Sequence, residues 1–371
     1  MTRSPEARRR APDLRADPPR SVLLVRLSAR GDVVFATPLV RAFKRTFPDV
    51  RITWVAEPHT VDLIQHHPLL DEVLVWPRQE LKALLKRGRL LAVWRRVRAF
   101  RRLLHERHFD LAIDLQGLLK SASLVFISGA RTRVGVGSRE FADRLVHYDF
   151  FDPDLSRVSS QYHELARCLG LETDGFAMEV AVSDEDARFA AEWARSEGLQ
   201  DGYAVLIPFT TWPQKHWVAE RWAEVAHGLE RALGLPSVLL GGPSDRAAAE
   251  PLLAQGPSSL RDLVGRTRLG QASAIVRGAR LAIGVDTGLT HIALAFDRPT
   301  VCIFGASLPY ESTPTERGII LREDIHCAPC WRNPVCNGLF TCMHMVTTHE
   351  VLEAAKGRLA FAEGGAGAEP A

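Results

Sequence analysis

Residues 21–47 read SVLLVRLSARGDVVFATPLVRAFKRTF, and this stretch decides the fold class. Its first seven residues are a largely apolar run with the length of a buried strand. A polar turn follows at 28–32, and from Val33 to Phe47 the apolar residues recur at helical spacing. A strand that leads through a short polar loop into a helix is the repeating unit of parallel α/β sheets.

The same unit recurs along the chain in two series. In the first series, short apolar runs bounded by polar residues or proline follow at 52–56, 73–76 and 111–115. A looser stretch at 156–174 and a predicted helix at 183–198 precede the second series, whose runs lie at 203–208, 237–242, 262–265, 281–286 and 300–305. Two series of similar length predict an α/β fold with two Rossmann-like lobes facing a cleft.

The domain prediction follows from these series. We place the first lobe at 21–175 and the second at 176–345, followed at 346–371 by a C-terminal helix, predicted over 348–361, and a frayed tail. Residues 1–20 hold six arginines and few large apolar residues, so we expect them to form a disordered basic leader.

Composition and charge narrow the class of protein. Hydrophobic residues make up 46% and charged residues 25% of the 371, which excludes a disordered chain. No apolar run approaches the roughly 18 residues of a membrane span, and none is long enough for the core of a signal peptide, so we expect a cytoplasmic protein.

The net charge of +3 hides a segment, 78–108, with eleven Lys/Arg against two Glu. This segment indicates either an acidic partner or a solvated helix face.

Two loops of the first lobe carry candidate functional residues. Asp32 opens the helix after the first strand, where a carboxylate serves either as a helix cap or as a general base. Asp114 closes a later strand and Lys120 follows it, which indicates either polar groups at the ligand site or a capped helix start.

Two loops of the second lobe suggest phosphate binding. The paired hydroxyls of Thr210 and Thr211, with Lys215, form a candidate phosphate clamp, although such residues are also common in surface loops. After the run at 281–286, a second group comprises Asp286, Thr287, Gly288 and His291. Thr287 and Gly288 open a helix whose N–H groups suit a pyrophosphate. Asp286 either orients this loop or holds a sugar hydroxyl, and His291 either packs in the core or joins the site.

Four of the six cysteines lie within sixteen residues, namely Cys327, Cys330, Cys336 and Cys342. Four thiolates are a ligand set for a structural zinc ion. The five-residue spacings differ from those of paired zinc knuckles, so unligated cysteines in a local loop are the alternative interpretation.

Taken together and in order, five segments resemble glycosyltransferase family 9, the ADP-heptose:lipopolysaccharide heptosyltransferases. They are RLSARGDVVFATPLVRAFKRTFP, DLQGLLKSA, the TT-x3-KHW loop, VDTGLTHIALAF, and CAPC with its two later cysteines. The resemblance covers residues 21 to about 355. It implies a GT-B fold and an inverting sugar transfer with no cofactor and no obligatory metal. The implied donor is ADP-heptose, and the implied acceptor is the inner core of lipopolysaccharide at the membrane surface.

The resemblance also implies roles for individual residues. Asp32 would be the general base, and Lys215 would stabilise the departing ADP. The donor would be bound by Thr210, Thr211, Lys215, Asp286, Thr287, Gly288 and His291, with Asp245 on the adenosine side. The acceptor would be bound by Ser28, Lys120, Arg139 and the basic residues Lys86, Arg87 and Arg89.

These implications define the expected partners and two alternatives. We expect a monomer, peripheral to the inner membrane, that binds no nucleic acid, because the basic segment has few interleaved aromatic residues beyond Trp94 and Phe100. One alternative is a family member that uses another nucleotide sugar or acceptor glycan. The other is a non-catalytic sugar-nucleotide-binding protein, which has no need of a base at Asp32.

Overall fold

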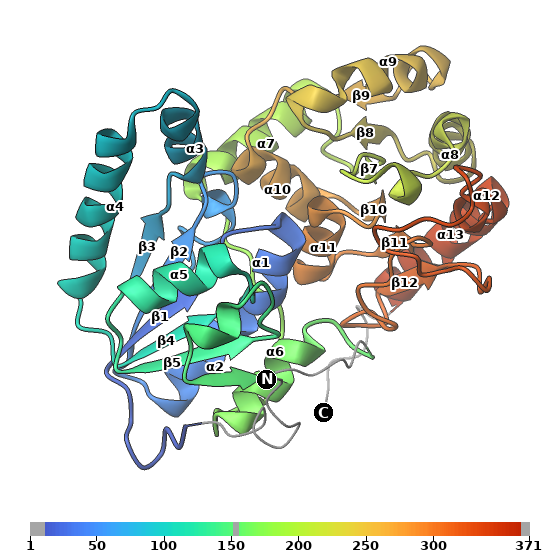
Figure 1. Cartoon of the computed structure of the whole chain (residues 1–371). Helices are drawn as coiled ribbons and strands as arrows, with labels where there is room; N and C mark the ends of the chain where they lie inside the picture. The colour runs from blue at the N-terminus through green and yellow to red at the C-terminus, as the bar shows by residue number, and fades with distance from the viewer. Residues whose placement is uncertain (1–11, 151–155, 365–371) are drawn as a thin grey trace, which may run out of the picture. The chain divides into compact units, whose positions relative to one another are not determined.

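A computed structural model describes residues 12–150 and 156–364 of the chain. Contacts divide it into two compact units (Figure 1). Within the described residues, unit 1 comprises 12–150 and 159–181, and unit 2 comprises 156–158 and 182–364. The main division therefore falls after residue 181, near the boundary that we placed at 175.

Unit 1 is built on a parallel six-stranded sheet in the order β3-β2-β1-β4-β5-β6. This is the Rossmann order, in which the second and third strands are added on one side of the first strand and the fourth to sixth strands on its other side. The strands are β1 (Ser21–Val25), β2 (Arg51–Ala56), β3 (Glu72–Val75), β4 (Leu111–Asp114), β5 (Thr132–Val136) and β6 (Tyr148–Phe150). The helices are α1 (Arg30–Ala36), α2 (Pro38–Thr46), α3 (Arg78–Lys86), α4 (Leu90–His105), α5 (Leu119–Ile127) and α6 (Ser160–Cys168).

Three expectations for unit 1 need correction. The single helix expected over 33–47 is two helices, because Pro38 starts a new helix and cannot donate a hydrogen bond to the preceding turn. The looser stretch at 156–174 contains α6, whose buried face includes Tyr162 and Leu165. The leader is ordered at 12–20, where Leu14 is buried, because its apolar side chain packs in the unit. Residues 1–11 of the expected leader lie outside the described residues.

Unit 2 repeats the same topology. Its parallel sheet has the order β12-β11-β10-β7-β8-β9, which is again the Rossmann order when counted from β7. The strands are β7 (Ala204–Ile207), β8 (Ser237–Leu239), β9 (Arg261–Asp262), β10 (Leu281–Val285), β11 (Thr300–Ile303) and β12 (Gly318–Leu321). The helices are α7 (Asp184–Ser196), α8 (Ala219–Leu233), α9 (Arg246–Gln255), α10 (Leu269–Gly278), α11 (Gly288–Ala295), α12 (Thr341–Met345) and α13 (Thr348–Gly364).

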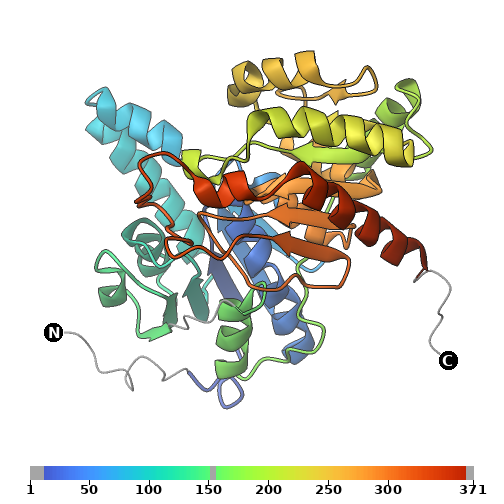
Figure 2. The ribbon, with the colours of Figure 1, turned by 90° about the vertical axis from the view of Figure 1, so that its right-hand side faces the viewer.

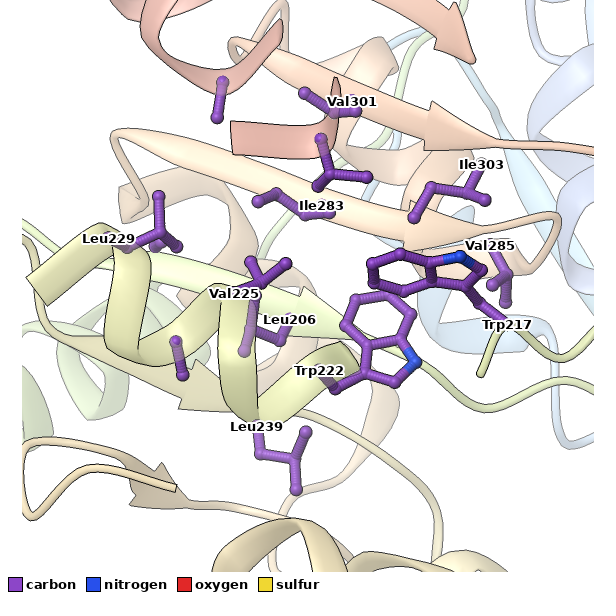
Figure 3. Packing of buried hydrophobic residues seen from close by; sticks show 14 of the residues in the cluster. Leu206, Trp217, Trp222, Val225, Leu229, Leu239, Ile283, Val285, Val301 and Ile303 are labelled. Carbon is purple, nitrogen blue, oxygen red and sulfur yellow. The ribbon is translucent and has the colours of Figure 1, made fainter. Parts of the chain in front are cut away.

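The core of unit 2 lies between its sheet and two long helices. Trp217 and Trp222 meet edge to face, with ring centroids 5.2 Å apart, and pack on aliphatic residues of β7, β10 and β11 (Figure 3). Val351, Ala355 and Leu359 of α13 belong to the same cluster, and Figure 2 shows α13 lying across the strands. The C-terminal helix is therefore part of unit 2. Among the described residues, no helix is long and apolar enough to cross a membrane.

Candidate functional site

The first group of candidate residues lies in unit 1, after β1 and β4. These two strands are parallel neighbours, so the loops that follow them leave the same edge of the sheet. The β1 loop leads into α1, which carries Asp32 in its first turn, and the β4 loop leads into α5, which carries Lys120. Sequence positions nearly ninety residues apart are therefore brought together.

Asp32 is held by one of its two carboxylate oxygens. Its Oδ2 accepts a hydrogen bond from the backbone N–H of Ala29 at 3.1 Å and pairs with Nη2 of Arg26 at 2.5 Å. The other oxygen, Oδ1, accepts no hydrogen bond from the described residues, and the side chain is 44% exposed. The capping contact expected of a carboxylate at a helix start is present, and one oxygen remains open to a ligand.

Arg26 is a buried guanidinium that comes from the end of β1. Besides Asp32, it donates to the carbonyl oxygen of Leu115, which also accepts the hydroxyl of Tyr162 at 3.0 Å. Its own carbonyl accepts the indole N–H of Trp54 at 3.2 Å. Rigid partners on several elements therefore fix the arginine, and the arginine fixes the direction of the Asp32 carboxylate. Sequence reasoning missed this role.

Ser28 and Lys120 meet beside Asp32. Ser28 Oγ accepts from Nζ of Lys120 at 3.3 Å and from the side-chain amide of Gln116 at 3.2 Å. Gln116 also accepts the backbone N–H of Leu27 at 3.2 Å, which ties the two loops together. The structure thus unites two of the expected acceptor residues, and it adds Gln116.

The carboxylate of Asp114 holds the backbone of the loop that follows β4. This buried carboxylate accepts the backbone N–H groups of Gln116 and Gly117 at 3.0 and 3.1 Å. Burial nevertheless raises the pKa of Asp114 to about 6, because removal from water disfavours the charged form. Gly117 has φ +67°, and a Cβ there would lie 2.5 Å from the carbonyl oxygen of Gly137. Glycine is therefore required at this position.

Basic residues of α3 act on Lys120. Its pKa is lowered from the usual lysine value, first by burial and then by the positive charge of Arg78, with Lys82 contributing. Arg78 and Lys82 were not among the candidates, although their spacing of four places them on one helix face.

The expected acceptor residues Lys86, Arg87 and Arg89 are exposed at the end of α3 and in the turn after it. Arg139 is also exposed, and its backbone N–H donates to Gly117 at 2.7 Å.

The second group of candidate residues lies in unit 2, around an ion pair between Lys215 and Asp286. Nζ of Lys215 lies 2.5 Å from Oδ2 of Asp286, and both side chains are largely buried. The Lys215 ammonium also lies over the indole ring of Trp212, 4.2 Å from the centroid. Lys215 follows β7, and Asp286 directly follows β10, the parallel neighbour of β7. The two candidate phosphate-binding loops therefore converge at one sheet edge.

Asp286 is fully engaged by protein groups. Oδ1 lies 3.0 Å from Nε2 of His291, whose other ring nitrogen is 2.9 Å from the hydroxyl of Tyr310. Oδ2 also accepts the hydroxyl of Ser307. Burial by itself would raise the pKa of Asp286, but the hydrogen bond from His291 and the charges of His291 and Lys215 hold it well below its usual range. Asp286 and His291 thus hold each other and the neighbouring Lys215 in place, while their contacts with a donor stay predictions.

The candidate phosphate-binding groups of these loops, two threonine hydroxyls and the N–H groups at the start of α11, have different surroundings. Thr210 donates to the backbone carbonyl of Asp286 at 3.1 Å, so it joins the two loops, whereas Thr211 is exposed. Thr287 is the N-cap residue of α11, and Gly288 is the first residue of that helix. The first N–H groups of a helix lack partners within it and attract anions.

Ser307 and Tyr310 are site residues that sequence reasoning missed. Both follow β11, which is paired in parallel with β10, so their loop leaves the same sheet edge as Asp286. Ser307, a polar residue two positions after the apolar run at 300–305, was the available signal. Asp245, the adenosine-side candidate, accepts the backbone N–H of Gly242 at 2.8 Å and so stabilises its own turn.

The four clustered cysteines do not form the candidate zinc ligand set, which was one of the two interpretations. Among the residues that the structure describes, no group of three or more His, Cys, Asp or Glu is placed to hold a metal ion. All four are free thiols, and Cys342 is buried in the unit 2 core. The loop is tied to the site by Gln214, whose amide donates to the carbonyl of Trp331 at 2.6 Å. No geometry in the described residues therefore supports the interpretation as a four-thiolate zinc site.

Comparisons with known proteins agree with these features. A family model described as glycosyltransferase family 9 (heptosyltransferase) matches residues 97–339. Lipopolysaccharide heptosyltransferase 1 of Pseudomonas aeruginosa is 31% identical over 318 residues, which cover 83% of this chain and 85% of that protein. Its namesake from Salmonella typhimurium is 28% identical over 309 residues, which cover 81% and 90%.

A solved structure shows the same fold. An Escherichia coli heptosyltransferase, solved with ADP-2-deoxy-2-fluoro heptose, matches with a TM-score of 0.70 and 22% identity, covering 91% of this chain and 99% of that one. Together with the two Rossmann-type sheets, this likeness confirms the predicted GT-B fold class.

Proposed function

The chain belongs to glycosyltransferase family 9, and we propose that it transfers a heptose from ADP-heptose to the inner core of lipopolysaccharide with inversion at the anomeric carbon. The observation that carries this proposal is the Asp32 carboxylate, which is fixed through Oδ2 and open at Oδ1. An inverting transfer needs one such base together with stabilisation of the leaving group.

The proposed reaction is a single displacement. Oδ1 of Asp32 takes the proton from an acceptor hydroxyl as that oxygen attacks the anomeric carbon of the heptose. The bond between this carbon and the β-phosphate oxygen breaks, and ADP leaves with the electron pair. Because the nucleophile enters opposite the leaving group, the configuration inverts. A positioned general base of this kind contributes about 10²–10⁴-fold in rate.

We assign stabilisation of the leaving diphosphate to Lys215, Thr211 and the N-terminus of α11. Lys215 is held in place by Asp286 and Trp212, so its charge needs little reorganisation when negative charge develops on ADP. The N–H groups at the start of α11 supply fixed dipoles of the same sign. Thr211 is exposed and offers its hydroxyl to a phosphate oxygen.

For the acceptor, we assign Lys120 and Ser28 to contacts next to the attacked hydroxyl. Inner-core lipopolysaccharide carries carboxylates and phosphates, which attract clustered lysine and arginine side chains. The effect of Arg78 and Lys82 on Lys120 supports extending this surface along α3. Lys86 continues the same spacing of four, whereas Arg87, Arg89 and Arg139 stay candidates for more distant acceptor groups.

The decisive experiment supplies pure protein with ADP-heptose and a panel of truncated core acceptors and reads the products by mass spectrometry. We expect one heptose to be added to an inner-core acceptor, with ADP released. If ADP-heptose is not consumed but another nucleotide sugar is, the chain is a family member with a different donor. Binding of sugar nucleotides without turnover of any would leave a non-catalytic binding protein.

Substitution of Lys215 tests the donor site. We expect Lys215→Ala to weaken ADP binding by about 10–100-fold, because a charge-assisted phosphate contact is worth roughly 1.5–3 kcal/mol. Isothermal titration calorimetry with ADP measures this directly. Lys120→Ala in unit 1 is the matched control and should leave ADP affinity unchanged. Equal ADP affinity in Lys215→Ala and the native protein would remove Lys215 from the donor site.

A chelation experiment tests the source of leaving-group stabilisation. Since Lys215 and the α11 N-terminus supply it, we expect the initial rate to survive EDTA without added Mg²⁺ or Mn²⁺. Initial rates with and without chelator, on protein whose circular dichroism is unchanged, provide the measurement. An immediate loss of activity that Mg²⁺ restores would assign the diphosphate to a metal ion instead.

A further inference from the structure

The end of α3 and the start of α4 expose large apolar side chains. Leu85, Leu90, Leu91 and Trp94 are between 49% and 66% exposed, although they lie within ten residues of one another. Figure 1 shows α3 and α4 as a pair of helices beside β3, the edge strand of the unit 1 sheet. Monomeric proteins scatter exposed apolar residues singly, so a cluster of this kind indicates an interaction surface.

Helix α4 has two distinct faces. Phe100 and Leu104 are buried, and Phe100 meets Trp76 edge to face at 4.8 Å, which anchors the helix to the unit. At 100° per residue, Leu91, Trp94 and Arg98 lie together on the opposite, exposed face. The guanidinium of Arg98 lies over the Trp94 ring, 5.2 Å from its centroid. The exposed face is therefore apolar at its start and cationic further along.

The charge around this apolar cluster has a single sign. Residues 82–102 contain nine Lys/Arg and no Asp or Glu. Among the described residues, one of these cations forms an ion pair, Arg96 with Glu80 at 3.0 Å. The remaining positive charge is available to an anionic partner.

We propose that this hairpin, residues 82–102, docks on the surface of an anionic phospholipid bilayer. Leu85, Leu90, Leu91 and Trp94 enter the headgroup boundary, and the surrounding lysines and arginines contact lipid phosphates. Tryptophan favours this boundary because its ring is apolar and its N–H is polar. Basic residues next to inserted apolar residues provide the two signals that stable but reversible membrane binding needs.

Charge complementarity and side-chain chemistry select this partner. In a symmetric contact with a second copy, nine cations of one hairpin would face the same nine of the other, which is repulsive. Single-stranded nucleic acids bind through aromatic stacking, which leucines cannot supply. The proposal rests on the proposed function in one respect, that a lipid-linked acceptor gives the enzyme a reason to be at the membrane.

The test is sedimentation with vesicles that contain no lipopolysaccharide. We expect the protein to bind vesicles of phosphatidylglycerol and phosphatidylethanolamine at low salt and to bind phosphatidylcholine vesicles far more weakly. The triple substitution Leu90→Ser, Leu91→Ser and Trp94→Ser should lower the partition coefficient about tenfold or more. The matched control, Val335→Ser with Leu339→Ser, removes two side chains of similar exposure from unit 2 and should change nothing.

A second measurement covers the case in which the triple variant fails to fold. Lipids brominated near the headgroup quench tryptophan fluorescence on contact, and Trp94→Phe should remove most of this quenching while binding persists. An unchanged midpoint of thermal unfolding and unchanged ADP affinity show that each variant is intact.

The outcomes separate this proposal from the proposed function. Failure of the native protein to bind anionic vesicles overturns the docking proposal, even if it transfers heptose to a water-soluble acceptor. Equal binding by the native and triple variant proteins, or quenching that survives Trp94→Phe, also overturns it. Lipid-free self-association that the triple substitution abolishes would assign the surface to a second copy. Vesicle binding with the expected losses supports docking, even if no heptose is transferred.

Discussion

Asp32→Asn is expected to lower kcat by about 10²–10⁴-fold, because the amide cannot accept the proton of the acceptor hydroxyl. The amide oxygen can still accept the backbone N–H of Ala29, so the helix cap is kept. Donor affinity should be unchanged, since the donor residues belong to unit 2. The measurement is steady-state kinetics at saturating acceptor, combined with ADP calorimetry.

The control for this substitution addresses stability. The Asn variant leaves the buried Arg26 without its ion pair, so kinetics should be measured well below the unfolding transition. Asp49→Asn changes a carboxylate in an exposed turn and should leave kcat unaltered. Near-normal turnover of Asp32→Asn would reduce Asp32 to a helix cap.

Asp286→Ala is expected to destabilise unit 2 by about 3–5 kcal/mol, because it removes one partner of a buried ion pair and leaves Lys215 uncompensated. His291 and Ser307 lose a hydrogen-bond partner at the same time. For a unit of this size, the midpoint of thermal unfolding should fall on the order of 10 °C. Calorimetry should show the shift in the transition that ADP stabilises, since that transition belongs to unit 2.

Two further variants serve as controls for the stability of Asp286→Ala. Asp201→Ala removes an exposed carboxylate from the same unit and should cost less than 0.5 kcal/mol. Combining Asp286→Ala with Lys215→Met should recover part of the loss, because the buried charge is then absent from both sides. A loss below 1 kcal/mol in Asp286→Ala would contradict the structural role of this carboxylate.

Local sequence patterns were sufficient for the sheets and for the places where the chemistry lies. Short apolar runs are buried strands because parallel strands are covered on both faces, and this holds for β1, β4, β7 and β10. Loops that follow such strands leave one edge of a sheet, so Asp32 and Lys215 could be assigned to functional loops. The break before Pro38 was not predicted, although proline starts a helix more easily than it continues one.

Tertiary structure alone decided which groups face each other. Two partners of Asp286 are Lys215, 71 residues earlier, and Ser307, 21 residues later, and no local periodicity relates them to Asp286. The same holds for the action of Arg78 on Lys120. The sequence by itself determined the strand-loop-helix units, since these depend on contacts within a few residues. Sheet pairing decided the ionic networks, since it joins the ends of strands that are distant in the chain.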